Sequence, residues 1–333
     1  MKIESVETLL AHTWCLVRVR TDTGLTGWGQ TAYFSCPEAA ERVVSRFREY
    51  LVGKDPLQIE RHWNYLFRSS PFRSADLCGG LSAIDMALWD IAGKRFEVPA
   101  YQLLGGKQRD KVRLHYLMAG SSNNTLDEIV VRAKHAVSEG FTALKLDPIP
   151  AGYQDLSFSR LVEEVVVRLG AVREVIGLDM DLGIEIHRKL VPGEAIALAE
   201  YLKPFRLLFY EDAIPPNSVD SQAQVTRNIA IPVAYGERYH TIHEFRDLLV
   251  RDGVHYLRPD VGLAGGISHC RKIAVLAEAF HASLIPHNFI SPLLTAATTQ
   301  LDMAIPNCAL QEHCLWDEEP PGNELLKVPL KRE

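Results

Sequence analysis

The chain has 333 residues and a formal net charge of −6, with 47% hydrophobic and 23% charged residues. These proportions are ordinary for a soluble globular enzyme, and the length allows one large barrel or two domains. The acidic balance offers no basic surface, so nucleic acid is not an expected partner. No apolar run has the length of a membrane span, and the N-terminus lacks the apolar region of a secretory signal.

The six cysteines are scattered and have no metal-ligand spacing: Cys15, Cys36, Cys78, Cys270, Cys308 and Cys314. Reduced thiols are the simplest interpretation, and they fit a protein of the reducing cytoplasm. We therefore expect a cytoplasmic protein. Separate expectations are a small-molecule substrate, no membrane partner and a homo-oligomer.

The first 112 residues predict an α+β domain. Strands are expected at 14–20 and 25–30, joined by a turn in which Gly24 can adopt a positive φ. Three helices should follow, at 37–51, 57–67 and 80–94. The last of these carries Ala83 and Ala87 at helical spacing, and such small residues predict close packing against another element.

From residue 113 onward, strands alternate with helices. Candidate strands lie at 113–119, 142–147, 181–187, 207–212, 232–237, 256–260, 283–287 and 308–313. The amphipathic helices between them include 125–139, 157–174, 192–202, 242–252, 267–280 and 292–304. Eight such strands favour a closed parallel barrel over an open sheet, and active sites of these barrels lie at the carboxyl ends of the strands. We expect the barrel to span residues 113–313, with a C-terminal segment, 314–333, that returns toward the N-terminal domain.

Three glutamates are evenly spaced at the ends of successive predicted strands. Glu185 and Glu211 are 211 − 185 = 26 residues apart, and Glu211 and Glu237 are 237 − 211 = 26 apart. This even spacing favours Glu185 over the nearby Asp179 and Asp181 as the first acid of the series. Buried charge is unfavourable unless it is paired or bound to metal. Three carboxylates without a thiolate or histidine cluster favour Mg²⁺, with Mn²⁺ as the second choice.

Further ionisable residues end the other predicted strands. They are Lys145, Asp147, His187, Asp260, His287 and Glu312. Glu185 and His187 are two residues apart on one strand, so their side chains should point the same way. So many ionisable groups at one barrel mouth predict chemistry there, although each alone could be a solvated or salt-bridged residue.

The chain resembles the enolase superfamily, in its mandelate racemase branch. The motifs that carry this resemblance are residues 17–29, the helix at 83–94, Lys145-Leu146-Asp147, Phe209-Tyr210-Glu211-Asp212, Tyr235-Gly236-Glu237-Arg238, Arg258-Pro259-Asp260, Ala264-Gly265-Gly266 and Pro286-His287. The resemblance implies a modified TIM barrel, (β/α)7β, with an N-terminal α+β capping domain. It also implies one Mg²⁺ on Glu185, Glu211 and Glu237, abstraction of a proton α to a carboxylate, and a metal-stabilised enediolate.

Within that branch, residues 183–188 look like the third-strand signature of acid-sugar dehydratases, especially galactonate dehydratase. The signature pairs a metal-binding acid with a catalytic histidine two residues later. Here the acid is Glu185, where the family has Asp. The implied reaction is the β-elimination of water from an aldonate such as galactonate or gluconate, which gives a 2-keto-3-deoxy acid.

The resemblance assigns a role to each remaining residue. His287 would be the general base, oriented by Asp260, and His187 would be the general acid that protonates the departing hydroxyl. Lys145 would place a second positive charge near the substrate carboxylate, or else form an ordinary ion pair with a neighbouring acid. Glu312 would hydrogen-bond the enediolate oxygen in its protonated form, which requires a raised pKa.

Two alternatives stay open. One is a hydroxy-acid racemase or epimerase of the same superfamily, in which the two histidines serve opposite faces of the substrate. The lysine bases of the related racemases and cycloisomerases are absent, because Asp147 and Asp260 stand at those positions. The other alternative is an inactive barrel, in which Glu185 and the short termini have removed activity. His115, His240 and His313 receive no catalytic role.

Overall fold

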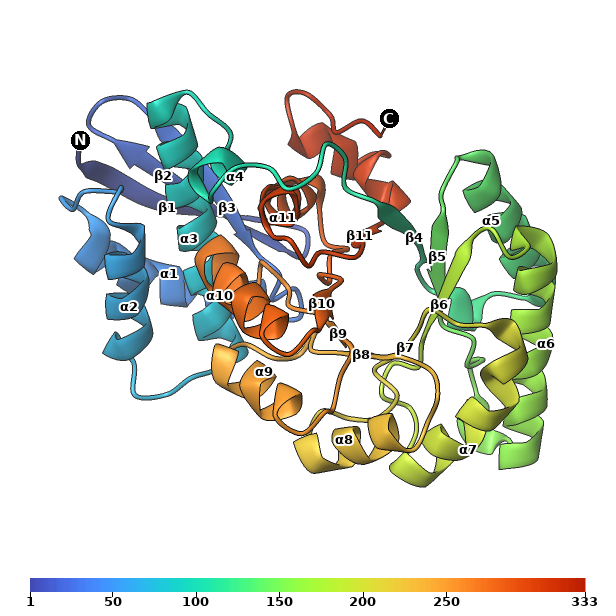
Figure 1. Ribbon diagram of the computed structural model, residues 1–333. Coiled ribbons are helices and arrows are strands. Elements are labelled where there is room, and N and C mark those ends of the chain that lie inside the picture. The colour runs from blue at the N-terminus through green and yellow to red at the C-terminus, as the bar shows by residue number, and fades with distance from the viewer. Residues whose placement is uncertain (333) are drawn as a thin grey trace.

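The computed structural model describes residues 1–332. Figure 1 shows an N-terminal unit, which we call the cap, beside a larger ring of strands and helices. The cap comprises β1 (Ile3–Ala11), β2 (Trp14–Thr21), β3 (Thr26–Thr31), α1 (Pro37–Leu51), α2 (Ile59–Ser69), α3 (Ala75–Phe96) and α4 (Ala100–Leu103). Its three strands form an antiparallel sheet in the order β1-β2-β3. Sequence patterns predicted β2, β3 and the three long helices within a few residues.

Close packing joins β3 to α3, as the small alanines of the helix predicted. A Cβ atom added to Gly27 would lie 2.0 Å from the carbonyl oxygen of Ala87, and one added to Gly29 would lie 1.9 Å from that of Ala83. Only glycine lets the strand approach the helix backbone so closely. The amphipathic sheet therefore buries one face directly on α3.

Eight parallel strands form the second sheet, in the order β10-β9-β8-β7-β6-β5-β4-β11. They are β4 (Leu114–Met118), β5 (Ala143–Leu146), β6 (Asp181–Glu185), β7 (Phe209–Glu211), β8 (Val233–Tyr235), β9 (Tyr256–Leu257), β10 (Ser283–Leu284) and β11 (Gln311–His313). The sheet closes where the Leu284 amide donates to the Asn307 carbonyl and the Ala309 amide donates to the Leu284 carbonyl, both at 2.8 Å. The eight predicted strands and the closed barrel are therefore confirmed.

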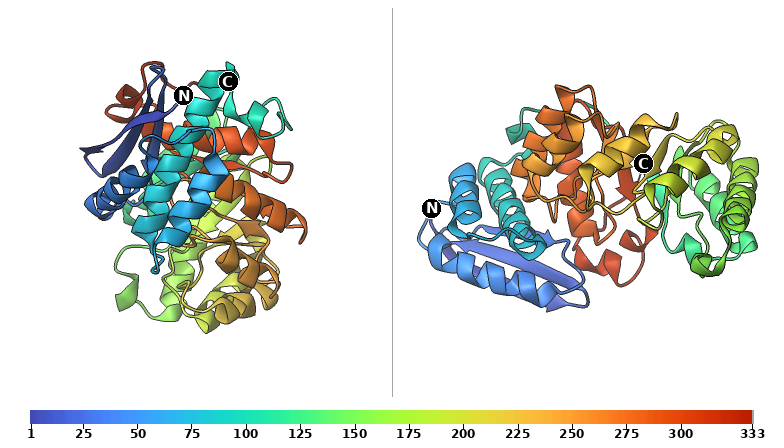
Figure 2. Two further views of the ribbon diagram at one scale, coloured as in Figure 1. Left: turned by 90° about the vertical axis from the view of Figure 1, so that its left-hand side faces the viewer. Right: turned by 90° about the horizontal axis from the view of Figure 1, so that it is seen from below.

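Helices cover the outside of this barrel, as the three views in Figures 1 and 2 show. They are α5 (Leu126–Ser138), α6 (Phe158–Ile176), α7 (Pro192–Leu202), α8 (Val219–Arg227), α9 (Ile242–Leu249), α10 (Gly266–Glu278) and α11 (Pro292–Ala304). Their apolar faces pack on the strands and make two large cores. Within residues 1–332, no helix combines the length and apolar character needed to cross a membrane.

The barrel interior has an apolar lower layer and a charged upper layer. The lower layer is built from Ala143, Phe209, Ala234, Ile285 and Leu310. Because side chains alternate along a strand, the inward-facing residues two positions later, such as Lys145 and Glu211, lie above that layer. The packed lower layer closes the barrel floor, so polar chemistry is confined to the carboxyl ends of the strands.

The cap docks on the N-terminus of α10. The Gly265 amide donates to Ser82 Oγ, and the Ser268 amide donates to Asp85 Oδ2, at 2.8 and 2.9 Å. Trp63 Nε1 donates to the Gly265 carbonyl at 2.7 Å. The first amides of a helix have no partners within the helix itself. Here α3 of the cap supplies acceptors for two amides and Trp63 of α2 donates to a carbonyl at the same place, so the two units share one helix terminus.

Candidate active site

The upper layer of the barrel is a buried network of charges. Lys145, Glu211, Arg258 and Glu312 are each at most 1% exposed. Lys145 Nζ lies 2.9 Å from Glu185, 3.0 Å from Glu211 and 2.7 Å from Glu312. These carboxylates outweigh burial and raise the pKa of Lys145, so the ammonium stays charged. Lys145 is thus ion-paired with its neighbouring acids.

Arg258 is the second cation of this layer. Its guanidinium lies 2.6 Å from Glu211 and 2.5 Å from Glu312, and it also donates to the Ile285 carbonyl at 2.9 Å. The side chain is completely buried, so its carboxylate partners are what keep it in the barrel. The two cations together hold Glu211 and Glu312 in place.

Three carboxylates form a cluster at the barrel mouth. Glu185, Asp212 and Glu237 are all buried, and one oxygen of each lies within 4.8 Å of the others. Two of them, Glu185 and Glu237, belong to the metal-binding set predicted from the sequence. The third predicted member, Glu211, points to Lys145 and Arg258 instead, while its neighbour Asp212 turns into the cluster with a φ of 42°. The assignment of Glu211 as a metal ligand stays a prediction.

The cluster suits a hard divalent cation. All its donors are carboxylate oxygens, which Mg²⁺ and Mn²⁺ prefer. Glu185 Oε1 is buried and accepts no hydrogen bond from the described residues. Burial raises the pKa of Asp212 to about 7, and the negative charge of Glu237 adds to that effect. A buried carboxylate oxygen without a hydrogen bond, next to two further buried carboxylates, fits a cation-binding site.

Arg188 reaches the same cluster from the segment that follows β6. Its NH1 atom lies 2.5 Å from Asp212 Oδ2 and 2.6 Å from Glu237 Oε1. His187 and Arg188 both have left-handed backbone conformations, with φ values of 53° and 63°. The Arg188 amide donates to the Asp212 carbonyl at 2.6 Å. This backbone path turns the guanidinium back over the barrel mouth.

His287 and Asp260 form a hydrogen-bonded pair at the ends of adjacent strands. His287 Nδ1 lies 2.6 Å from Asp260 Oδ2, and its Nε2 lies 3.6 Å from Glu237 Oε2. Burial disfavours the imidazolium, but Glu237 and Asp260 outweigh it and raise the pKa of His287 to about 9. The pairing expected from the sequence is present, with Nε2 left free of the orienting bond.

His187 has an equivalent partner that the sequence did not reveal. Its Nδ1 lies 2.7 Å from Asp147 Oδ2, which also receives Lys189 Nζ at 2.5 Å. His187 Nε2 lies 3.2 Å from Glu185 Oε1. Burial opposes the charged form, but Asp147 and Glu185 raise the pKa of His187. Asp147 was placed from the sequence among the ionisable strand-end residues, at the position of a missing lysine, and the structure makes it the partner of His187.

Glu312 departs from the expected protonated form. Burial favours the neutral acid, yet Arg258 and Lys145 lower the pKa of Glu312 well below its ordinary value. His115 Nε2 lies 3.8 Å from the same carboxylate, and burial lowers the pKa of this histidine to about 4. Glu312 is therefore an anion in this arrangement, and the raised pKa predicted from its proposed role is wrong.

His313 and His240 make their contacts outside the two carboxylate–histidine pairs. His313 Nε2 lies 2.6 Å from Glu318, and the side chain points away from Glu312 as strand alternation predicted. His240 lies 3.9 Å from Glu244 on the next helix.

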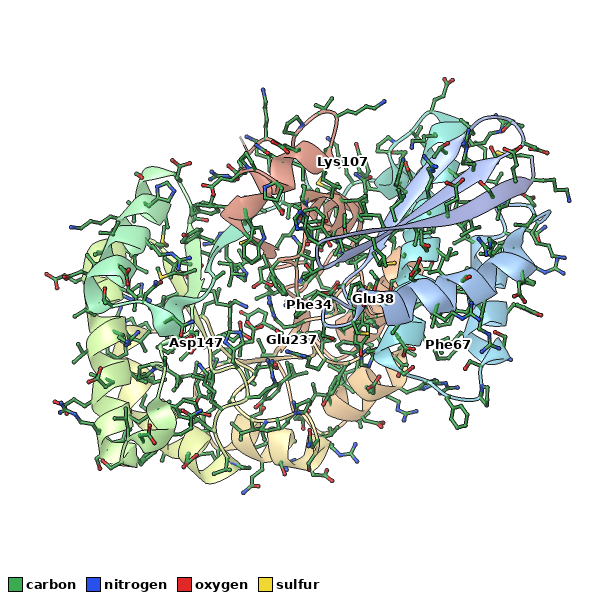
Figure 3. The ribbon with its side chains drawn as sticks, turned by 180° about the vertical axis from the view of Figure 1, so that it is seen from behind. Phe34, Glu38, Phe67, Lys107, Asp147 and Glu237 are labelled. Atoms are coloured by element: carbon green, nitrogen blue, oxygen red, sulfur yellow. The ribbon has the colours of Figure 1, made fainter. Side chains whose placement is uncertain are left out.

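A cavity of about 560 Å³ opens above the charged cluster. Its polar lining includes Asp147, His187, Arg238 and His287. An aromatic wall closes one side. The Phe34 and Phe289 rings lie 5.4 Å apart, the Phe289 and Trp316 rings 5.9 Å apart, and Trp316 Nε1 donates to the Phe289 carbonyl. Figure 3 shows Phe34 of the cap on the side of the barrel that carries Glu237. The site is therefore completed by residues of the cap and of the C-terminal segment.

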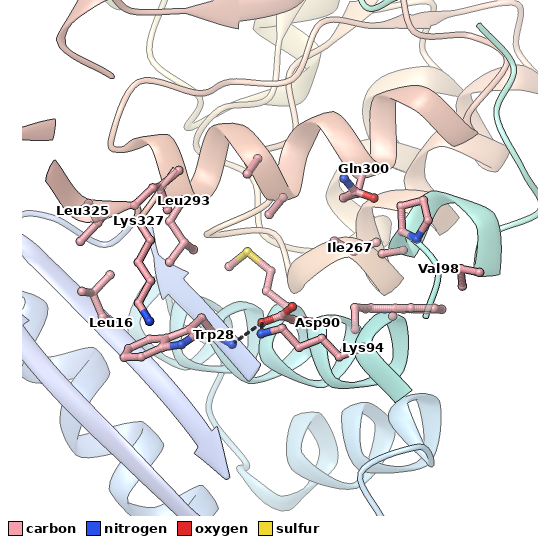
Figure 4. Close-up of a pocket in the computed structure, with 18 of the residues that line it drawn as sticks. Leu16, Trp28, Asp90, Lys94, Val98, Ile267, Leu293, Gln300, Leu325 and Lys327 are labelled. Carbon is pink, nitrogen blue, oxygen red and sulfur yellow. Dashed lines mark hydrogen bonds and ion pairs between the residues drawn. The ribbon is translucent and has the colours of Figure 1, made fainter. Parts of the chain in front are cut away.

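A larger cavity, of about 910 Å³, lies between the cap and α11 (Figure 4). Leu16, Trp28, Leu293 and Leu325 give it an apolar lining, and Asp90 is engaged by the Trp28 amide and Lys94. None of the predicted site residues lines it. Residues 325–327 of the C-terminal segment reach the cap here.

Sequence reasoning missed Arg188, Arg258 and Asp212 as parts of the site. Arg258 and Asp212 both lie inside motifs that were recognised. Each is close in sequence to a strand-end acid, and this proximity was the signal that could have identified them. Arg188 directly follows the signature histidine, but its direction depends on backbone angles that the sequence does not display.

Comparison with known families gives two matches that together span nearly the whole chain. Residues 128–333 match the family model described as enolase C-terminal domain-like. Residues 2–105 match the model described as mandelate racemase / muconate lactonizing enzyme, N-terminal domain.

Several curated relatives are named D-galactonate dehydratase. The one from Variovorax paradoxus (strain S110) is 32% identical over 338 residues, which cover 100% of this chain and 87% of the relative. The one from Ralstonia pickettii (strain 12J) is 33% identical over 331 residues, covering 98% of this chain and 85% of the relative.

Solved structures match the fold closely. A putative dehydratase from Salmonella typhimurium has a TM-score of 0.94 and 30% identity, covering 100% of this chain and 92% of its own. A putative galactarate dehydratase from Agrobacterium radiobacter, with bound Na and L-malate, has a TM-score of 0.90 and 30% identity, covering 94% of this chain and 80% of its own.

Proposed function

Because the chain belongs to the mandelate racemase / muconate lactonizing enzyme family of the enolase superfamily, we propose that it catalyses the Mg²⁺-dependent dehydration of a sugar acid. The substrate would be an aldonate such as galactonate or gluconate, and the product a 2-keto-3-deoxy acid. The relatives named D-galactonate dehydratase support this reaction class. The carboxylates of Glu185 and Glu237 would hold the metal together with Glu211 or Asp212. A bound Mg²⁺ would act as a Lewis acid toward the substrate carboxylate.

The observation that carries this proposal is a pair of histidines on opposite sides of the barrel mouth. His287 follows β10 and His187 follows β6. These strands are four apart in the eight-stranded sheet, whichever way one counts. Each imidazole has its Nδ1 bound to its own carboxylate, at 2.6 and 2.7 Å. A carboxylate on one ring nitrogen fixes the orientation of the ring and leaves the other nitrogen to move a proton.

The dehydration needs one base and one acid. His287 Nε2 would remove the proton α to the substrate carboxylate, which requires that the negative charge of Glu237 be balanced so that the imidazole is neutral. His187 Nε2 would then donate a proton to the departing β-hydroxyl. Because the two residues face each other across the mouth, we expect the proton and the hydroxyl to leave from opposite faces. Lys145 would add positive charge where negative charge develops on the substrate.

The walls of the cavity also suit this class of substrate. Arg188, Lys189 and Arg238 line it together with five carboxylates. A bound divalent cation would add to these three cations and offset the carboxylates, which would allow an anionic substrate to bind. Phe34, Phe289 and Trp316 present apolar ring surface, on which the C–H face of a polyol chain can pack.

A screen of aldonic and aldaric acids with Mg²⁺, read out as 2-keto-3-deoxy acid, tests the proposal. At least one acid should react, and both H187N and H287N should separately abolish the reaction. Activity that survives both substitutions would rule out the assigned roles.

Epimerisation of a hydroxy acid is the second candidate, because opposed histidines also suit proton transfer between two faces. The reaction in D₂O separates the two functions. Dehydration gives a keto acid, whereas epimerisation gives deuterated diastereomers of the substrate and no keto acid.

A further inference from the structure

The cation-binding cluster already holds a cation that belongs to the chain. The NH1 atom of Arg188 lies within 2.6 Å of two of the three clustered carboxylates, Asp212 and Glu237. The third, Glu185, is paired with Lys145 at 2.9 Å. Every carboxylate of the cluster therefore has a cationic partner within the protein.

The position of Arg188 is built into the backbone. Two consecutive non-glycine residues, His187 and Arg188, adopt the left-handed conformation, which L-residues with a Cβ atom disfavour. The amide of Arg188 is held by the Asp212 carbonyl at 2.6 Å. The local backbone conformation therefore directs the guanidinium toward the cluster, where it forms its ion pairs. The Arg188 side chain is only 18% exposed.

A divalent cation and this guanidinium would compete for the same oxygens. Mg²⁺ takes oxygen ligands at 2.0–2.1 Å in near-octahedral geometry. A guanidinium nitrogen on two of those oxygens holds lone pairs that the metal requires and adds a repulsive positive charge. Arg188 also lines the cavity above the cluster, so its side chain has space into which it can move.

We propose that Arg188 is a resident competitor of the metal ion. Its guanidinium occupies the cation site when metal is absent, and metal binding requires that it leave Asp212 and Glu237. This inference rests on the proposed function only in assuming a divalent-cation site at this cluster. Its consequence is a metal affinity lower than the three carboxylates would give alone, so that the occupancy of the site follows the metal concentration around the protein.

Direct measurement of metal binding tests the inference without any sugar acid. The full chain would be stripped with EDTA and titrated with Mn²⁺, with free Mn²⁺ followed by electron paramagnetic resonance. R188A should bind one Mn²⁺ per chain at least about tenfold more tightly than the wild type, because a competing charge within a few ångströms is removed. Mg²⁺ should displace this Mn²⁺.

The matched control is R238A. Arg238 Nε also contacts Glu237, at 3.1 Å, but its side chain is half exposed and it does not contact Asp212. R238A should bind Mn²⁺ within about threefold of the wild type, since an exposed charge is screened by solvent. An equal increase in Mn²⁺ affinity in both variants would show a general effect of removing positive charge and would overturn the inference. An R188A variant that binds Mn²⁺ no more tightly than the wild type would also overturn it.

Thermal unfolding is a second measurement, and it distinguishes a change in metal binding from a folding defect. In EDTA, R188A should melt below the wild type, because Asp212 and Glu237 lose their partner while remaining buried. Saturating Mn²⁺ should bring R188A back to the melting temperature of the Mn²⁺-bound wild type. A loss that metal does not restore would overturn the inference. If neither protein binds Mn²⁺, the metal site and this inference both fail, whereas tight binding by R188A without sugar-acid dehydration would count only against the proposed function.

Discussion

Asp260 Oδ2 lies 2.6 Å from His287 Nδ1, and the two residues also form an isolated parallel bridge between the ends of their strands. The backbone bridge thus holds Asp260 and His287 side by side, which is the arrangement that their side-chain hydrogen bond requires. Asp260 is held in turn by the Gly262 amide, which donates to its Oδ1 at 2.7 Å. The orientation of the imidazole is therefore set by two strands and a loop together.

Loss of the Asp260 carboxylate should lower the rate while leaving substrate binding nearly intact. In D260N the amide cannot enforce the same ring tautomer, so kcat should fall by about 10²- to 10⁴-fold, with KM within about threefold. D181N is the control, because Asp181 pairs with Arg113 outside the site and should leave both constants unchanged. A large rise in KM with an unchanged kcat would make Asp260 a substrate-binding residue.

His187 should act after the α-proton has been removed. H187N should therefore form no keto acid, yet still exchange the substrate α-proton with solvent in D₂O, as followed by proton NMR. H287N should show neither exchange nor product. D147N should resemble a weak H187N, since the His187 ring would lose its 2.7 Å partner. Absence of exchange in H187N would make that residue the base or a substrate-positioning group.

The third metal ligand can be identified by comparing E211Q with D212N. An oxygen of Asp212 lies in the cluster with Glu185 and Glu237, whereas Glu211 faces Lys145 and Arg258. We expect D212N to weaken Mn²⁺ binding by tenfold or more, on the order of 1.4 kcal/mol. E211Q should change the affinity less and the melting temperature more. The reverse pattern would restore the ligand set predicted from the sequence.

Arg258 should be essential for stability. R258L would leave Glu211 and Glu312 buried without this cation, which destabilises a protein by about 3–5 kcal/mol. Urea unfolding followed by circular dichroism measures the loss. R246L is the control, because Arg246 pairs with Asp247 on the exposed surface and should contribute less than about 1 kcal/mol. Equal effects of the two substitutions would contradict a structural role for the buried pair.

Asp85 should make the stability depend on pH. Burial raises the pKa of Asp85 from 3.8 to about 7, so between these values the folded protein keeps a proton that the unfolded chain has released. The stability contributed by this proton is fully present below about pH 4 and is lost as the pH rises through 7. D85N removes the titration, so its free energy of unfolding, relative to wild type, should increase from pH 5 to pH 8.

Urea unfolding at the two pH values measures this effect. S82A is the control, because it removes the other capping bond of α10 without a titratable group and should have the same effect at both pH values. Parallel stabilities of wild type and D85N at pH 5 and pH 8 would exclude Asp85 as the titrating group.

Much of the fold could be predicted because its signals are periodic. All eight barrel strands were recognisable as short apolar runs between amphipathic helices, but most were predicted too long at their carboxyl ends. Asp260 and His287 illustrate the reason. They continue the direction of β9 and β10, yet they meet through a single bridge and their side chains rather than through a continued ladder.

The sequence predicted only those parts of the site that are positioned by the ends of the parallel strands. Glu185, Glu237, His187 and His287 follow parallel strands, whose carboxyl ends must converge. Arg188 could not be foreseen, because its direction depends on two left-handed residues. The charge state of Glu312 depends on Arg258, which contacts it from two strands away around the closed barrel. Such partnerships are set by the closed barrel rather than by any local pattern.

The shared terminus of α10 restricts how a substrate can reach the site. Lifting the cap as a rigid body would break the bonds from Ser82, Asp85 and Trp63 at once and would leave the first amides of α10 without partners. We therefore expect entry and product release to use local movement of the Phe34 and Trp316 segments, which border the cavity. The rate of substrate and product exchange would then depend on this aromatic border of the cavity rather than on a hinge between the two units.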